Sequence, residues 1–277
     1  YLIENDFKYN KEKVKKIVLS VVDEQFAELD STERLKADNL VKEAYALCDK
    51  IFEQVSNSNF KPIFAEKKFY DENYSKNVVV SGKIDRIDQF DNMFLIFDYK
   101  TGSKTDFSFQ DVYYGNKIQI VLYLDILESV LNLISAGAFY VPIKNKFIME
   151  EKVDRASGIF LDSADLIKNI DKNIDENAPK SKIFKIDFGK NGVLSAYSQK
   201  LALSPVEFLA VKQYVKALFE NAVEETCSGY IEPKPTKNAC NNCPYAVMCA
   251  FSKKDSGVRA NEQDISKQSF VKTEEKL

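Results

Sequence analysis

The sequence of 277 residues contains no histidine. This absence excludes general acid/base catalysis by histidine, nucleophilic machinery that pairs histidine with serine or cysteine, and any histidine-ligated metal within the chain. Long hydrophobic runs are also missing, since no stretch approaches the roughly eighteen apolar residues of a membrane span. No signal-peptide pattern opens the sequence. We therefore expect a cytoplasmic protein that has no membrane partner.

Arginine is scarce, and it occurs only at Arg34, Arg86, Arg155 and Arg259. Lysine therefore accounts for most of the 39 basic residues, which 42 acidic residues outnumber to give a net charge of −3. This balance argues weakly against a protein whose whole surface binds nucleic acid, although lysines can line a local groove that follows phosphates. Hydrophobic residues make up 45% of the chain, enough for a sizeable core. Because the chain begins with Tyr1, we expect it to be a piece of a longer protein.

Hydrophobic periodicity predicts a mixed order of helices and strands. Helical spacing of apolar residues runs through 11–56 and is interrupted by a polar tract at 30–33. Three runs rich in β-branched and aromatic residues predict strands, and the last two are close enough to form an antiparallel hairpin. These runs are 61–70, 77–88 and 93–100.

The second half of the chain continues the alternation. We expect helices over 116–133, 161–174 and 205–226, the last one capped by Ser204, and strands over 136–143, 147–153 and 181–188. An α-β-β-β-α-β order predicts a mixed α/β domain in which helices flank a central mixed sheet. The polar segment from 252 to 277 is expected to be a frayed tail.

Two neighbouring predicted strands carry more charge than buried strands usually do. They read Ser-Gly-Lys-Ile-Asp-Arg-Ile-Asp at 81–88 and Ile-Phe-Asp-Tyr-Lys-Thr-Gly at 96–102. Because side chains alternate along a strand, Asp98 and Lys100 point to the same face, and Asp85 can lie beside Asp98 across the hairpin. Glu66 could join them from the preceding run.

Carboxylates gathered on one face repel one another unless a cation lies between them. An oxygen-only set of ligands is available from Asp85, Asp98 and the backbone carbonyl of Tyr99, with Glu66 as an additional carboxylate. Such a set suits Mg²⁺ or Mn²⁺. Lys100 is placed to hold or deprotonate a water and to offset charge on a phosphate. A plain surface hairpin would also explain the alternating charge, but not why both aspartates follow apolar runs.

Three ordered motifs carry a family resemblance: Gly-Lys-Ile-Asp-Arg-Ile-Asp (82–88), Asp-Tyr-Lys-Thr-Gly (98–102) and Tyr-Gly-Asn-Lys-Ile-Gln-Ile-Val-Leu-Tyr-Leu (114–124). Together they resemble the RecB-like branch of the PD-(D/E)xK nuclease superfamily, and most closely its AddB/RexB-type nuclease domains. The resemblance implies that Asp85 is a core metal ligand, that Asp98 and Lys100 are the D-x-K pair, and that Glu66 is the first acidic residue. It also implies that Gln119 and Tyr123, which share one face of a helix, form the Q-x-x-x-Y motif.

The same resemblance implies a restriction-endonuclease-like core and a domain plan. Residues 1–252 would form the nuclease domain, with a helical lead-in at 1–60, a catalytic core at 61–145 and a cysteine loop at 227–250, followed by a flexible tail at 253–277.

The implied function is a Mg²⁺-dependent exonuclease that cuts single strands of DNA fed from an unwound duplex end, during break repair and recombination. The implied partner is an AddA-type helicase–nuclease subunit, which fits the lack of a Gly-x-x-x-x-Gly-Lys-[Ser/Thr] loop for ATP in this sequence. Two alternatives remain, a non-catalytic nuclease fold that binds DNA or aids assembly, and an iron–sulfur redox protein.

Three of the five cysteines, Cys240, Cys243 and Cys249, lie within ten residues. An odd number of cysteines does not indicate a disulfide framework, whereas three clustered thiolates suggest an Fe–S or Zn²⁺ site. From the residues alone, the fourth ligand could be Cys227 or Cys48. The resemblance implies instead a [4Fe–4S] cluster whose fourth cysteine lies far upstream, and neither that cysteine nor the family's early histidine is visible here. We expect Cys48, on the apolar side of a helix, to be a core thiol.

Overall fold

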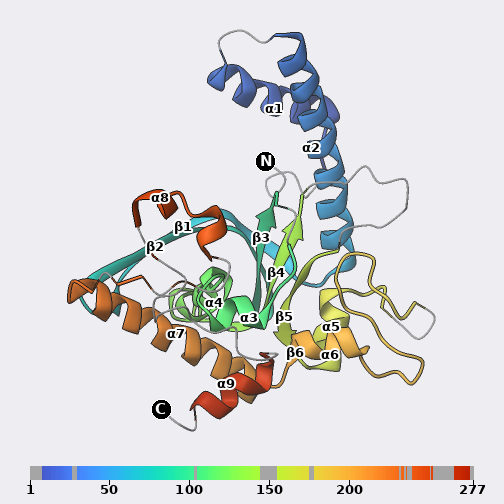
Figure 1. Cartoon of the computed structure of the whole chain (residues 1–277). Helices are drawn as coiled ribbons and strands as arrows, with labels where there is room; N and C mark the ends of the chain where they lie inside the picture. Colours follow the sequence, from blue (N-terminus) through green and yellow to red (C-terminus); the bar gives the residue numbers. More distant parts are fainter. Residues whose placement is uncertain are drawn as a thin grey trace.

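The computed structural model describes residues 8–26, 30–102, 105–143, 155–174, 178–230, 232–233, 235, 239–249, 251 and 265–274. Within them, a six-stranded sheet of order β1-β2-β3-β4-β5-β6 forms the centre of the molecule (Figure 1). The strands are β1 (Lys61–Ser75), β2 (Val78–Phe90), β3 (Met93–Lys100), β4 (Ile134–Pro142), β5 (Ser157–Leu161) and β6 (Ala202–Leu203). The pairs β3/β4 and β5/β6 are parallel and the others antiparallel, so the predicted mixed α/β fold is confirmed.

Two N-terminal helices, α1 (Lys11–Gln25) and α2 (Ser31–Asn57), form a hairpin that stands out from the sheet (Figure 1). Asp30 begins α2 through a reciprocal capping box with Glu33, which satisfies two backbone N–H groups at the helix start. The polar tract predicted as a break is therefore the cap of the second helix. The C-terminal end of α2 is tied to the sheet by Lys61, whose ammonium donates to the carbonyl of Val55.

Aromatic side chains pack on both faces of the central strands. Phe97 and Phe139 are register partners on β3 and β4, and their rings stack with centroids 5.8 Å apart. Phe184 closes over Phe139 at 4.9 Å. Tyr140 follows Phe139 and therefore points to the opposite face, where it stacks on Phe107. The two faces thus have separate aromatic clusters.

Four helices build the layer around Tyr140. They are α3 (Phe109–Tyr113), α4 (Gln119–Leu131), α7 (Pro205–Cys227) and α9 (Lys267–Glu274). α4 contacts β4 and α7, and Lys212 of α7 reaches Glu128 of α4 at 2.6 Å. The long helix after Ser204 was predicted from the sequence, and Ser204 does cap it. No helix in the described residues combines the length and apolarity needed to cross a membrane.

The strand predicted at 181–188 is wrong. This segment makes only isolated bridges, such as Ala156 with Phe184. The Ser181 hydroxyl accepts from the backbone N–H groups of Ile183 and Phe184 and donates to Asp171, so a side chain replaces the strand ladder. The strand predicted at 147–153 lies outside the described residues.

The short strand β5 was not predicted, because its five residues include buried Ser157 and Gly158 rather than an apolar run. Gly158 is required by close packing, since a Cβ there would lie 1.8 Å from the carbonyl oxygen of Ala138. The helix expected over 161–174 is shortened to α5 (Ala164–Ile170), and a short α6 (Ala196–Leu201) follows later in the chain.

The frayed tail expected at the C-terminus is wrong for residues 267–274. These residues form α9, whose Phe270 is fully buried. The Phe270 ring packs at 5.0–5.9 Å from the rings of Phe109, Tyr113 and Tyr214. The packing of Phe270 holds this helix against the core. The sequence did not predict the helix, because the residues around Phe270 are polar.

Candidate active site

Strands β1, β2 and β3 bring three carboxylates into one row. Ala65 pairs with Arg86 and Lys67 with Ile84, so the residues between them, Glu66 and Asp85, are opposite each other. The pairing of Arg86 with Phe97 continues the row from Asp85 to Asp98 on β3. The structure therefore juxtaposes the three acidic residues that the sequence singled out.

Asp85 is half-buried beside the backbone of β3. Its Oδ2 accepts a hydrogen bond of 2.8 Å from the backbone N–H of Tyr99. Burial raises the pKa of Asp85, and the carboxylates of Asp98 and Glu66 raise it further, against the Tyr99 N–H and the Lys100 ammonium, which lower it. The Asp85 carboxylate therefore interacts electrostatically with Asp98, Glu66 and Lys100.

Asp98 and Lys100 form an ion pair, with Lys100 Nζ 2.7 Å from Asp98 Oδ2. The approach is not directed as a hydrogen bond, so this buried Oδ2 has no hydrogen-bond donor among the described residues. Lys100 also lies over the ring of Tyr140, 5.3 Å from its centroid. Burial and the Asp98 carboxylate raise the pKa of Tyr140, so its phenol stays protonated. Asp98 thus offers an oxygen that is buried and lacks a donor.

Glu66 lies in the middle of β1 with a φ of +54°. This left-handed conformation costs a residue other than glycine about 1–2 kcal/mol, so a strained backbone marks this position. The Glu66 carboxylate forms an ion pair with Lys83 of β2 and is largely exposed. Lys83 was not singled out from the sequence, although it lies one residue past Gly82 in the first motif.

The carboxylate oxygens of the row are suitable ligands for a divalent cation, although the three side chains do not converge on one point. Among the described residues, no three Cys, Asp or Glu side chains are grouped as a metal cage. Lys83 and Lys100 instead neutralise Glu66 and Asp98. A buried carboxylate oxygen without a donor, beside a second carboxylate of raised pKa, is nevertheless the kind of site that Mg²⁺ or Mn²⁺ stabilises.

Gln119 and Tyr123 lie on one face of α4, as expected, and Gln119 Nε2 donates to the Tyr123 phenol oxygen at 3.0 Å. Their described contacts are with each other and with the β1–β2 hairpin. The Tyr123 ring packs edge-on against Phe69 at 5.1 Å, and its oxygen fills the space where Gly82 lacks a side chain. The pair therefore supports the hairpin that carries Glu66 and Asp85.

A second charged group lies on the opposite face of the same strands. Arg86 Nε is 2.8 Å from Asp88 Oδ1, and both side chains are almost fully buried. Arg86 also donates to the Tyr99 phenol oxygen at 2.8 Å and lies 4.1 Å from the centroid of Phe97. Burial raises the pKa of Asp88 to about 6 despite Arg86. Sequence reasoning missed this group; its signal was a charge at every second position within an apolar run.

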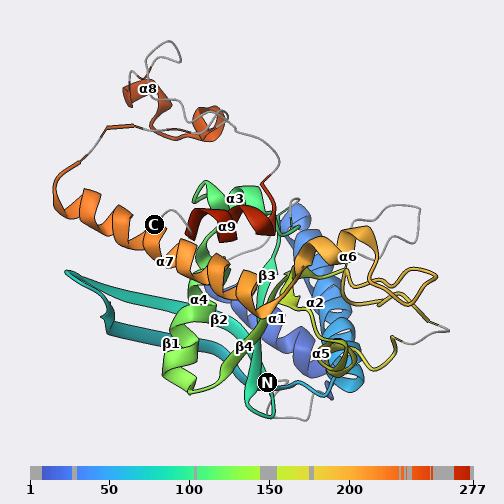
Figure 2. The ribbon, with the colours of Figure 1, turned by 90° about the horizontal axis from the view of Figure 1, so that it is seen from below.

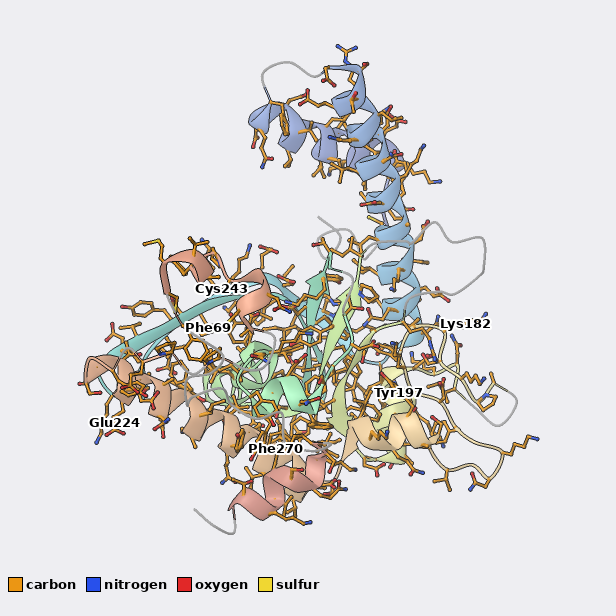
Figure 3. The ribbon with its side chains drawn as sticks, viewed as in Figure 1. Phe69, Lys182, Tyr197, Glu224, Cys243 and Phe270 are labelled. Carbon is orange, nitrogen blue, oxygen red and sulfur yellow. The ribbon has the colours of Figure 1, made fainter. Side chains whose placement is uncertain are left out.

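The cysteines lie in three separate parts of the chain. Cys240 and Cys243 lie in and after a 3-10 turn, η2 (Ala239–Asn242), and Cys249 ends α8 (Ala246–Cys249). Figure 2 shows α8 standing away from the sheet, and Figure 3 labels Cys243 in this segment. Cys227 is exposed at the end of α7, whereas Cys48 is buried in α2, as expected of a core thiol. Within the described residues, the thiols do not complete a metal site.

Known proteins match most of this chain in sequence. The family model for the PD-(D/E)XK nuclease superfamily matches residues 4–250. Among similar proteins are AddB-type subunits of ATP-dependent helicase/deoxyribonucleases: that of Clostridioides difficile is 30% identical over 84% of this chain and 23% of its own length. The homologue from Clostridium kluyveri is 25% identical over 84% of this chain and 21% of its own, and that from Clostridium tetani is 28% identical over 91% and 25%.

The chain thus spans about a quarter or less of these relatives. The family model covers nearly all of the chain, including every residue of the carboxylate row. We conclude that this chain belongs to the PD-(D/E)XK nuclease superfamily.

Proposed function

We propose that this chain is a metal-dependent deoxyribonuclease domain that hydrolyses phosphodiester bonds of single-stranded DNA. The observation that carries the proposal is the row of Glu66, Asp85 and Asp98 across three strands, with Lys100 at the Asp98 carboxylate. A scaffold has no need for such a cluster, because gathered carboxylates destabilise a fold unless they serve a cation.

In this proposal Asp85, Asp98 and the backbone carbonyl of Tyr99 hold Mg²⁺ or Mn²⁺, and Glu66 assists. The bound cation supplies positive charge against the negative charge that grows on the phosphate in the transition state. The Tyr99 N–H keeps the Asp85 carboxylate oriented toward β3. Lys100, which is 39% exposed, is free enough to leave Asp98 and position the attacking water by donating to it.

The substrate and the partner are proposed from the relatives, whose names describe an ATP-dependent helicase and deoxyribonuclease. We infer that an AddA-type helicase–nuclease subunit and the remaining part of a longer polypeptide unwind the duplex and feed single strands to this domain. The reaction would then belong to the processing of DNA ends before recombination, in the cytoplasm.

The cysteine segment is proposed as a metal–thiolate site of the [4Fe–4S] type, with Cys240, Cys243 and Cys249 as three ligands. The fourth ligand would be an upstream cysteine outside this chain, and exposed Cys227 is the local alternative. Iron and sulfide analysis after anaerobic reconstitution tests the idea. Equal incorporation into the chain and into Cys243→Ser would contradict it.

The catalytic proposal is tested by cleavage of a 5′-labelled oligonucleotide with Mg²⁺ and with EDTA. Asp98→Asn and Lys100→Ala should each abolish the Mg²⁺-dependent product, whereas Asp49→Asn should not, since Asp49 lies on the helical hairpin formed by α1 and α2. Cleavage by both site variants at the parent rate would contradict the assigned site. A parent chain that binds DNA but never cleaves it would favour the non-catalytic alternative.

A further inference from the structure

The outer face of the β1–β2 hairpin carries a row of side chains that the proposed reaction does not use. The two strands pair without interruption from Lys67 to Asp71, which places Lys68 opposite Lys83 and Tyr70 opposite Ser81. Phe69, labelled in Figure 3, packs against α4, so its neighbours Lys68 and Tyr70 point away from that helix. Figures 1 and 2 both show this hairpin extending beyond the rest of the sheet.

Two lysines face each other in this row. Cross-strand partners have Cβ atoms about 5 Å apart, and like charges at that separation destabilise a sheet. Glu66 offsets the charge of Lys83, but exposed Lys68 has no ion-pair partner among the described residues. An anion lying across the two strands would relieve this repulsion.

An aromatic side chain follows the lysines. The Tyr70 side chain is 66% exposed and makes no ring contact or hydrogen bond with any described residue. Val79, on the neighbouring strand and two residues before Ser81, is 48% exposed and enlarges the apolar spot. Exposed aromatic rings beside cations are the usual elements of surfaces that bind unpaired bases and their phosphates.

The row leads to the carboxylates. Lys83 contacts Glu66 directly, and Asp85 is opposite Glu66. Tyr70 is four residues from Glu66 along β1, which corresponds to roughly 13 Å at about 3.3 Å per residue. The acidic residues Asp71 and Glu72 come directly after Tyr70, so the positive part of the hairpin ends there.

We propose that this row, Tyr70, Lys68 and Lys83, is a binding track that guides single-stranded nucleic acid to the carboxylate row. A base stacks on Tyr70, and the following phosphates lie over Lys68 and Lys83. Duplex DNA is a poor ligand for the track, because its bases are already stacked and paired. The inference rests on the proposed nuclease function and adds the residues that hold the strand before it reacts.

The test measures binding without cleavage, by fluorescence anisotropy of labelled oligo(dT) with the full 277-residue chain in EDTA. Removing a stacking platform costs about 1–3 kcal/mol per base, so Tyr70→Ala should weaken binding by about 5- to 150-fold. Tyr70→Phe keeps the ring and should bind within about twofold of the parent. Lys68→Gln should lower the slope of log K against log salt by about 0.7, the value for one phosphate of a single strand.

Lys200→Gln is the matched control, because Lys200 is an exposed lysine on α6, distant from the hairpin in both views. Parent-like binding by Tyr70→Ala and an unchanged salt slope in Lys68→Gln would overturn the track. If Mg²⁺-dependent cleavage persisted in that case, the nuclease assignment would stand without the track. Loss of binding in Tyr70→Ala, in a chain that never cleaves DNA, would support the track and contradict the proposed catalysis.

Discussion

The two faces of β2 and β3 both carry charged side chains, but one face is partly exposed to solvent and the other is buried. On one face, Asp85 and Asp98 are partly open to solvent, and Asp98 forms an ion pair with Lys100, whose side chain is partly exposed. On the other face, Arg86 and Asp88 are sealed behind Phe97 and Tyr99. In the proposed function the open face accepts a cation from solvent, whereas the sealed face contains its own cation, the Arg86 guanidinium. Residues one position apart would then serve cation binding and stability respectively.

Removing one charge from each face should separate these roles. Asp98→Asn removes one charge from the open face, and we expect single-turnover cleavage to fall by about 1000-fold or more, since each 1.4 kcal/mol lost in the transition state costs tenfold. Its free energy of unfolding in urea should change by less than about 1 kcal/mol, because the lost ion pair with Lys100 is partly exposed. A large loss of stability would show that the open face is structural.

Arg86→Met removes the cation from the sealed face. The Asp88 carboxylate is then buried without its counter-charge, so we expect the free energy of unfolding to drop by about 3–5 kcal/mol. Urea titration followed by circular dichroism measures the loss. The double variant Arg86→Met/Asp88→Leu should recover most of it, since neither charge is then buried. Equal loss in the single and double variants would mean that packing, not charge, matters there.

The sealed face should also respond to pH. Because burial raises the pKa of Asp88 to about 6, against about 3.9 for an unfolded aspartate, the folded chain binds this proton more tightly. The stabilisation that this proton gives the folded chain is therefore complete below about pH 4. It is lost as the pH rises through about 6, which lowers the free energy of unfolding by up to about 3 kcal/mol. Unfolding free energies of the parent and Asp88→Asn between about pH 4 and pH 7 test this. Parallel curves would contradict the assignment.

The smallest effect of these substitutions is expected at Tyr99, whose phenol contacts Arg86 on one face and whose backbone N–H contacts Asp85 on the other. Tyr99→Phe removes the acceptor of the Arg86 hydrogen bond but keeps the ring and the backbone N–H that holds Asp85. A hydrogen bond to a charged group contributes about 1.5–3 kcal/mol, so stability should fall by about that amount, with only a few-fold change in cleavage. Tyr214→Phe, which loses a phenol hydrogen bond to the Tyr113 carbonyl, is the control for a general packing effect.

The sequence predicted the open face better than the sealed one. Alternation along two short strands was enough to place Asp85, Asp98 and Lys100 near one another, because side-chain direction has a period of two residues. The role of Arg86 could not be deduced in this way, since it depends on Tyr99 and Phe97 of the neighbouring strand and on burial by a distant segment. The helix around Phe270 was missed for a similar reason, because tertiary packing rather than local composition stabilises it.

The wrongly predicted strand has its cause in side-chain hydrogen bonds. The segment 181–188 has the composition of a strand, but the Ser181 hydroxyl and the Arg155 guanidinium, which donates to the Ser181 carbonyl at 2.9 Å, bind its backbone instead. Side-chain hydrogen bonds of this kind depend on residues distant in sequence, and periodicity does not register them.

The central claim is that the open face binds a divalent cation. Isothermal titration of Mn²⁺ into the purified chain, beside Asp98→Ala and the control Asp49→Ala, tests it without relying on DNA or turnover. We predict saturable binding in the parent and in Asp49→Ala, and none in Asp98→Ala. Equal binding by the parent and Asp98→Ala would contradict the account, because the cation would then be held elsewhere.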